Sequence, residues 1–408
     1  MKIRFLLLNA YAVGGTVRTV VNQANALAEA GHDVEITSVH RHRPAPVFAL
    51  HGRVRLRALV DDTAATGTTT SASWPRRRIE AWLGARPSQL VPAAEVKYHR
   101  FSRLTDRRLV RYLRSLDGGV LITTRPALNL LSARFTPASV IGIGQEHLHH
   151  AHHKPALDQQ IGLWYPRLDA LTVLTEADRG AYTARLGSDG PRIVGIPNPL
   201  PAGSPTRSTL DRPLVLSAGR LVKAKGFDSL IEAFAPVAEA HPDWQLRIYG
   251  SGPERDRLRA LIHRWHLYNH VYLMGSTPHL EAELAKASVF ALASRHEGFG
   301  MVLAEAMSHG VPPVSFDCPH GPREIITGGD GLLISPGDTR ALTQAVTHLI
   351  ERPTMRAELG EQAAASALRY RPERIRAQWE TLIAELAAKP GRERPRGRRR
   401  HRTLRVVR

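Results

Sequence analysis

Short apolar runs alternate along the chain with stretches of helical periodicity. Residues 3–8 predict a buried strand, and the apolar positions within residues 17–28 keep helical spacing behind Gly14-Gly15. Gly31 ends this helix, and residues 34–39 alternate into a second strand, which completes a β-α-β unit. Further strands are predicted at residues 120–123, 139–144 and 170–174, with helical stretches between them. This order is typical of a parallel sheet with helices on both faces.

The same alternation restarts after a connector. Residues 187–212 concentrate Gly, Pro and Ser, as in a segment with few packed contacts. Beyond it we predict strands at 214–218, 245–249, 271–274, 289–293 and 313–316, and helices at 227–240, 254–265, 280–286 and 302–308. The predicted fold class is α/β, with a first Rossmann-like domain over residues 1–197, a linker over 198–212 and a second domain over 213–371. A final helix near residues 372–388 is expected to pack back on the first domain, ahead of a disordered basic tail, 389–408.

Composition excludes several classes of protein. The chain has 408 residues, 43% of them hydrophobic, which is ample for buried cores and rules out disorder of the whole chain. Its single cysteine, Cys318, excludes an internal disulfide and favours a reducing, cytoplasmic setting. Residues 5–8 are too short an apolar run for the core of a secretion signal, and no run of ~18 apolar residues predicts a membrane-spanning helix.

The positive charge is confined to two regions. The net charge of +19 divides into +10 over residues 41–117 and +9 over the tail, and the remaining residues sum to zero. Such localised charge indicates an anionic partner or surface. The tail has no aromatic residue for base stacking, so specific nucleic-acid binding is not expected. Residues 74–83 combine Trp and Arg like an interfacial helix, which favours docking of residues 41–117 and the tail on an anionic membrane surface.

Candidate chemistry follows several strands of the second domain. Glu297 lies in a loop with Gly298-Phe299-Gly300, and Glu305 lies in the helix that begins there. Main-chain N–H groups at such a helix start favour anionic or electron-rich oxygens. After the first strand of this domain come Arg220 and Lys225, whose charges suit a diphosphate. Each of these segments on its own is also compatible with an ordinary surface loop.

Taken together, the motifs resemble a known enzyme family. They are Gly-Arg220…Lys225-Gly, Gly250-x-Gly-Pro-Glu254, Ser-Arg-His-Glu297-Gly-Phe-Gly…Glu305 and Gly321-Pro-Arg-Glu324…Asp338. Their order and spacing resemble the retaining GT-B glycosyltransferases of family 4 (glycosyl transferases group 1), in which the two glutamates form the E-x7-E motif. The resemblance is strong over residues 213–386 and weaker over 1–197, and the basic regions have no counterpart.

The resemblance implies roles for matching residues. The donor-binding set would be Gly15, Arg220, Lys225, Gly250, Glu297, Phe299, Gly300, Met301 and Glu305. Arg220 and Lys225 would bind the donor diphosphate, Glu305 the ribose hydroxyls, and Glu297 the transferred sugar. Phe299, Gly300 and Met301 would offer backbone amides. The implied reaction transfers a sugar with retention from a nucleotide-diphospho-sugar, a UDP-sugar in our prediction, and needs no cofactor or metal.

A run of histidines follows the strand predicted at 139–144. The resemblance places His147 on the acceptor side of the cleft, and we assign it to the catalytic residues beside Glu297. His147, His149, His150, His152 and His153 have two other interpretations, a metal site and simple solvation. Adjacent histidines cannot all converge on one ion, so we predict no metal.

Acceptor and location are predicted more coarsely. We expect a glycan, lipid-linked or anionic polymer acceptor in the cell envelope, reached from the cytoplasm at the inner membrane face. Alternatives are a transferase of teichoic-type polyol-phosphate polymers, and a non-transferase GT-B enzyme such as a sugar-nucleotide epimerase or a phosphorylase. An NAD-dependent oxidoreductase is disfavoured because Gly-x-Gly-x-x-Gly is absent after the first strand and His40-Arg-His-Arg follows the second.

Overall fold

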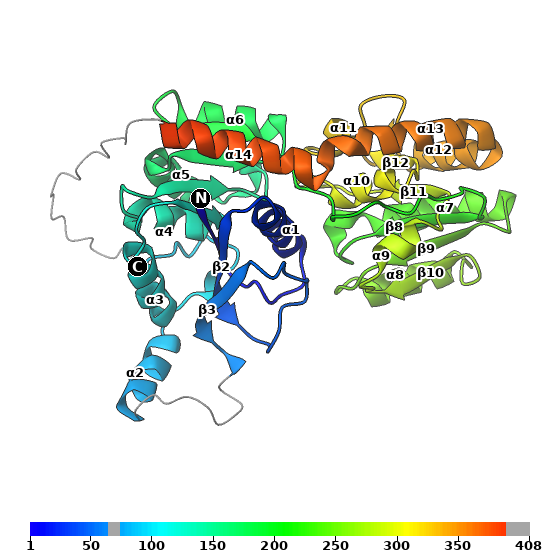
Figure 1. The fold of residues 1–408 in the computed structure, drawn as a ribbon. Coiled ribbons are helices and arrows are strands. Elements are labelled where there is room, and N and C mark those ends of the chain that lie inside the picture. Colours follow the sequence, from blue (N-terminus) through cyan, green and yellow to red (C-terminus); the bar gives the residue numbers. More distant parts are fainter. Residues whose placement is uncertain (64–73, 389–408) are drawn as a thin grey trace.

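Two parallel sheets, each covered by helices, make up the protein. The computed structural model describes residues 1–63 and 74–388. The first sheet has the order β3-β2-β1-β4-β5-β6-β7 and the second the order β10-β9-β8-β11-β12-β13. In Figure 1 the first domain lies on the left and the second on the right, and α14 runs along the first domain. The expected α/β fold with two doubly wound domains is confirmed.

The first domain and the last helix comprise β1 (Lys2–Leu7), α1 (Gly15–Glu29), β2 (Asp33–Arg41), β3 (Arg55–Asp61), α2 (Trp74–Gly84), α3 (Arg103–Arg114), β4 (Val120–Thr124), α4 (Pro126–Phe135), β5 (Ile141–Gln145), α5 (Pro155–Trp164), β6 (Ala170–Val173), α6 (Glu176–Leu186), β7 (Arg192–Gly195) and α14 (Pro372–Ala388). The second domain comprises β8 (Leu214–Ala218), α7 (Phe227–Ala240), β9 (Gln245–Tyr249), α8 (Arg255–Arg264), β10 (Val271–Gly275), α9 (Leu280–Leu284), β11 (Val289–Leu292), α10 (Met301–Ser308), β12 (Pro313–Phe316), α11 (Pro322–Ile325), β13 (Leu332–Ile334), α12 (Thr339–Glu351) and α13 (Pro353–Ala367).

Five of the six strands of the second domain lie where the apolar runs predict them, whereas β13, at an edge of the sheet, was not predicted. β8 and β12 are buried at every position, as expected for central strands of a sheet covered on both faces. Two strands of the first domain were not predicted either. β3 alternates exposed and partly buried residues at an edge of the first sheet, and β7 pairs in parallel with β6 inside the predicted connector. The connector prediction was therefore wrong over β7, because pairing overrides the local Gly and Pro signal.

The chain crosses between the domains twice. The first crossing follows β7, and the second leads from α13 to α14, whose Ile375, Trp379 and Leu382 belong to the core beneath α1. At the crossing the Leu200 N–H donates to the Tyr370 carbonyl oxygen over 2.8 Å. The two segments thereby support each other at the place where the domains join.

No helix in the described part of the chain is long and apolar enough to span a membrane. The proposed tail lies outside the described residues.

Candidate active site

Loops from both domains meet at the carboxyl ends of the two sheets. In open parallel sheets ligands bind at this edge, where the loops after neighbouring strands converge. The second domain contributes the segments after β8, β9, β11 and β12, and the first domain contributes those after β1, β5 and β6. Direct contacts join them: the Glu324 carboxylate accepts the backbone N–H groups of Glu176 and Ala177 over 2.8 and 3.1 Å. The site is therefore built between the domains.

Lys225 and Glu297 form the centre of this arrangement. The Lys225 Nζ lies 2.5 and 2.6 Å from the two carboxylate oxygens of Glu297. The Ser294 hydroxyl donates to the same carboxylate over 2.7 Å, and the Glu297 side chain is only 5% exposed. A buried carboxylate is stable only with such partners. The structure thus brings together two residues that the sequence analysis placed in separate motifs.

A glycine permits this close approach. Gly226 follows Lys225 with a φ of 60°, and a Cβ there would lie 1.9 Å from the Ala293 carbonyl oxygen. Only glycine adopts this positive φ without strain, and only glycine lacks the Cβ that would clash with the carbonyl oxygen. The loop after β8 can therefore lie directly on the end of β11, which places Lys225 against Glu297.

Arg220 differs from its neighbour Lys225. Its side chain is exposed, and no side-chain partner for it exists among residues 1–63 and 74–388. Gly250, predicted to belong to the donor-binding set, packs against the backbone of the neighbouring loop: a Cβ there would lie 1.8 Å from the Gly219 carbonyl oxygen. Arg220 thus leaves a guanidinium available for a ligand, and Gly250 has a structural reason to be glycine.

The loop after Glu297 turns into α10 through backbone that needs glycine. Gly300, with a φ of 98°, caps the helix, and Met301 is its first residue. The Phe299 ring is buried and meets Tyr370 edge to face, with 5.5 Å between the centroids. Phe299 could therefore contact a ligand only through its backbone, which agrees with the amide role implied by the resemblance.

Glu305 is paired across the domains. An Arg18 Nη atom lies 3.1 Å from a Glu305 carboxylate oxygen, and the other Arg18 Nη contacts Glu281. Burial raises the pKa of Glu305 to about 6, with Arg18 opposing and Glu281 adding to the shift. Neither Arg18 nor Glu281 was among the residues predicted for the site. The available signal was a charged residue in the first turn of α1, directly after Gly14-Gly15.

The start of α1 faces the same region through Gly15. Gly14 caps this helix without a side-chain hydrogen bond, and a Cβ at Gly15 would meet nothing within 4 Å. The first N–H groups of a helix have no partner within the helix, and the dipole there favours anions. The start of α1 therefore presents main-chain N–H groups without a side-chain cap, in the place where the sequence predicts Gly15 to contact the donor.

His147 lies against the Glu297 loop. A Cβ at Gly298 would be 2.7 Å from the His147 carbonyl oxygen, so these loops of the two domains touch. Burial, with a smaller effect of Arg125, lowers the pKa of His147 to about 4. Its Nε2 has no partner within the described chain. A neutral imidazole in this place can donate or accept a hydrogen bond but is a weak base at neutral pH.

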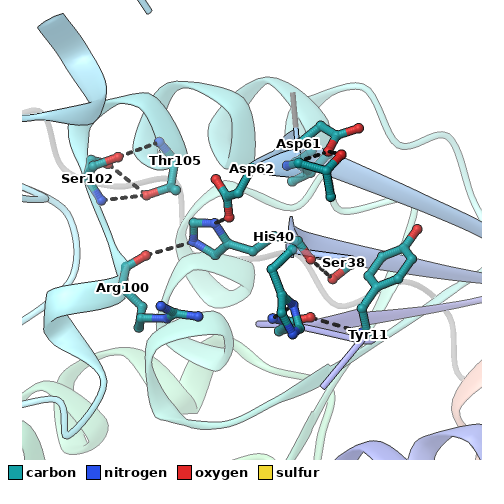
Figure 2. A network of polar contacts seen from close by, with 12 residues as sticks. Tyr11, Ser38, His40, Asp61, Asp62, Arg100, Ser102 and Thr105 are labelled. Atoms are coloured by element: carbon teal, nitrogen blue, oxygen red, sulfur yellow. Dashed lines mark hydrogen bonds and ion pairs between the residues drawn. The ribbon is translucent and has the colours of Figure 1, made fainter. Parts of the chain in front are cut away.

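Another polar network lies at the far edge of the first sheet, after β1, β2 and β3. Figure 2 shows His40 between Asp62 and Arg100: its Nδ1 is 2.9 Å from Asp62 Oδ2, and its Nε2 is 2.8 Å from the Arg100 carbonyl oxygen. Arg43 and Arg100 are exposed, and after burial they are the main causes that lower the pKa of His42. The basic region thus presents exposed guanidinium groups at this edge of the first sheet.

Comparison with known proteins gives the family context. Residues 204–366 match the family model of glycosyl transferases group 1. The chain is 39% identical over 392 residues to an exopolysaccharide phosphotransferase of Streptomyces coelicolor, covering 95% of this chain and 41% of that protein. It is 31% identical over 179 residues to the poly(glycerol-phosphate) alpha-glucosyltransferase of Bacillus subtilis, covering 40% of this chain and 27% of that protein. The chain thus spans about two fifths of the first relative's length.

A solved structure supports the fold. TarM of S. aureus, crystallised with UDP and alpha-GlcNAc-glycerol, superposes with a TM-score of 0.74 at 17% identity, covering 94% of this chain and 100% of that chain. The protein therefore has the GT-B fold, and its second domain matches the glycosyl transferases group 1.

Proposed function

We propose that this GT-B protein with a group 1 glycosyltransferase domain is a retaining, family 4 glycosyltransferase. It transfers a sugar from a nucleotide-diphospho-sugar, a UDP-sugar first among donors, to a cell-envelope polymer or lipid-linked acceptor. The observation that carries the proposal is the buried Lys225–Glu297 pair at the carboxyl edge of the second sheet, with Arg220 unpaired nearby and Glu305 buried in the adjoining helix.

Cleavage of the sugar–phosphate bond separates charge. Negative charge develops on the leaving diphosphate and positive charge on the sugar ring. The negative charge on the diphosphate would be stabilised by Lys225, by Arg220 and by the backbone N–H groups at the start of α10. The positive charge on the sugar ring would be stabilised by the Glu297 carboxylate. In this proposal the donor phosphate takes over Lys225 from Glu297, which leaves the carboxylate free to orient the sugar.

The proposal includes retention without a protein base. A leaving phosphate oxygen on the same face of the sugar can accept the acceptor's proton while the acceptor oxygen bonds to the anomeric carbon. His147, neutral at working pH because burial lowers its pKa to about 4, would hydrogen-bond to sugar or acceptor hydroxyls. The test is the anomeric configuration of the product by NMR, where inversion would contradict the mechanism.

Transfer is proposed to need no Mg²⁺ or Mn²⁺ at the diphosphate, because cationic side chains provide the charge there. A screen of UDP-, GDP- and ADP-sugars for hydrolysis, with and without added Mg²⁺, tests donor and metal together. Turnover that depends on Mg²⁺ would contradict this part. Glu297→Ala should lose most activity, whereas Glu361→Ala, on an exposed side chain paired with Arg207, should retain it. Equal activity of Glu297→Ala and wild type would contradict the site.

The acceptor is proposed to be anionic. Arg43 and Arg100 are exposed on the first domain, and two similar proteins are named for poly(glycerol-phosphate) and exopolysaccharide. A teichoic-type polyol-phosphate polymer is the first acceptor to test, with neutral glycans as controls. Release of a free epimerised sugar nucleotide, without any acceptor, would instead indicate a GT-B epimerase.

Membrane docking is proposed for helix α2, which projects from the first domain at the lower left of Figure 1. Its Ile79 and Trp82 are about half exposed, and the Arg86 guanidinium lies 3.8 Å from the Trp82 ring centroid. An interfacial helix presents such apolar and cationic groups together. Trp82→Ala should reduce sedimentation with anionic liposomes at low salt, and unchanged sedimentation would contradict docking through this helix.

A further inference from the structure

Histidines from both domains meet beside the candidate active site. His149 and His152 follow β5 in the first domain, whereas His296 and His320 follow β11 and β12 in the second. The His149 and His320 rings stack with 4.2 Å between centroids, and the His149 and His152 rings meet edge to face at 3.9 Å. His152 and His296 are 5.7 Å apart. These contacts join segments that lie far apart in the sequence.

Three ring nitrogens of this cluster have no hydrogen-bond partner in the described part of the chain. His149 is buried, and neither of its ring nitrogens has a partner in the described part of the chain. The Nδ1 of His320 has no hydrogen bond either, and it lies 3.9 Å from the carboxylate of Asp178. A buried polar atom without a partner is unfavourable by about 1–3 kcal/mol, so such groups require an explanation.

Hydrogen bonds within the first domain orient the Asp178 carboxylate. Its carboxylate accepts the His150 N–H over 3.0 Å and contacts the Thr175 hydroxyl at 3.3 Å. Hydrogen bonds of this kind orient a carboxylate that serves as a ligand. The ligand atoms of His149, Asp178 and His320 all lie within 4.8 Å of one another.

The backbone of His320 is strained. Its φ is +64°, one of few positive values at non-glycine residues in the described chain. Gly321 follows with a φ of +106°, and a Cβ there would lie 2.1 Å from the Phe299 carbonyl oxygen. The contact with the Glu297 loop therefore holds His320 in a conformation that turns its ring towards His149. Strain of this kind persists where the surroundings enforce it, and it concentrates at functional sites.

We propose that His149, Asp178 and His320 bind one divalent transition-metal ion of the zinc class, and that this ion joins the two domains. Small side-chain rotations would bring the three ligand atoms to the ~2.1 Å that zinc requires. Three protein ligands leave a fourth position, which water or the neighbouring His152 can occupy. Two imidazoles and one carboxylate favour zinc over Mg²⁺ or Ca²⁺, which prefer oxygen ligands alone.

This site differs from the donor site in place and purpose. The donor diphosphate is assigned to Lys225 and Arg220, whereas the metal is assigned to residues of the loops after β5 and β12 and of α6. An anion is the less suitable occupant, because the Asp178 carboxylate lies within the cluster and would repel it. Asp178 and His320 lie far from the run of histidines in the sequence and were not predicted as ligands, but the fold brings both to His149.

Metal binding by itself provides the test. The full chain is stripped with a chelator and titrated with Zn²⁺ by calorimetry, and with Co²⁺, whose visible spectrum reports tetrahedral coordination. We expect one site that raises the melting temperature. His149→Ala, His320→Ala and Asp178→Asn should each weaken it by more than about 10-fold, whereas His263→Ala, on an exposed helix position, should bind as wild type does.

Two results would overturn the proposal. One is the absence of a tetrahedral cobalt spectrum in the wild type, and the other is wild-type affinity in His320→Ala. Circular dichroism of the metal-free variants separates loss of ligation from loss of folding, and His320, being partly exposed, is the variant least prone to unfold. Because the readout is metal binding, its failure leaves the proposed transferase function untouched.

Discussion

Replacing Lys225 by methionine tests how Glu297 is kept charged in a buried place. The substitution keeps the unbranched four-atom stem of the side chain and removes its ammonium group, so the Glu297 carboxylate loses contacts of 2.5 and 2.6 Å and retains only the Ser294 hydroxyl. Breaking a buried ion pair on one side costs about 3–5 kcal/mol. Lys225 is 20% exposed, so solvent screens part of this interaction. We expect the free energy of unfolding to fall by about 2 kcal/mol.

The assay is urea denaturation of Lys225→Met, of Glu297→Gln and of the double variant, combined with donor hydrolysis. The double variant has no buried charge at this place, and we expect its stability to return to within about 1 kcal/mol of wild type while its activity stays lost. Lys223→Met, in the same turn but exposed, is the matched control and should change neither quantity. A Lys225→Met protein as stable as wild type, or a double variant no more stable than Lys225→Met, would refute the reasoning.

Four further predictions concern Glu305 and the glycine turn. Because burial raises the pKa of Glu305 to about 6, its carboxylate becomes protonated below that pH. The KM for the donor should therefore rise as pH falls through about 6. Glu305→Gln should remove this pH dependence. The same raised pKa means that Glu305 binds a proton more readily in the folded protein than in the unfolded chain. The free energy of unfolding should therefore fall as pH rises from about 4.5 to 6. A difference in the free energy of unfolding between wild type and Glu305→Gln that stays constant over this pH range would contradict the prediction. Arg18→Ala should move the KM midpoint to higher pH, since Arg18 lowers the pKa of Glu305; an unchanged midpoint would show that the pair is not formed in solution. Gly226→Ala places a Cβ 1.9 Å from the Ala293 carbonyl oxygen and should destabilise the protein by about 3 kcal/mol or more, whereas Gly52→Ala, where a Cβ meets nothing within 4 Å, should change stability little in the same urea assay.

Much of the second domain could be predicted element by element. β8, α7, β9 and β12 have the predicted bounds, because runs of apolar residues and helical spacing are local properties that the buried faces of this sheet require. β3 was missed because three of its seven residues are charged and it lies at an edge. There pairing with β2, and not burial, makes the strand.

The candidate site divides in the same way. The positions of Arg220, Lys225, Glu297 and Glu305 relative to turns and helix starts were predictable, because each follows a strand that its own apolar run marks. The pairing of Lys225 with Glu297 was not, since it depends on Gly226 allowing one loop to approach the next.

By itself the sequence determined two doubly wound domains, the second-domain motifs and the places where charge gathers. Only the tertiary structure decided which of these groups meet. Arg18 contacts Glu305 and His149 contacts His320 because the carboxyl ends of the two sheets face each other. Contacts between residues more than a hundred positions apart leave no periodic signal in the chain. Periodicity records the burial of each element against its own sheet, whereas a site between domains depends on how the finished sheets pack together.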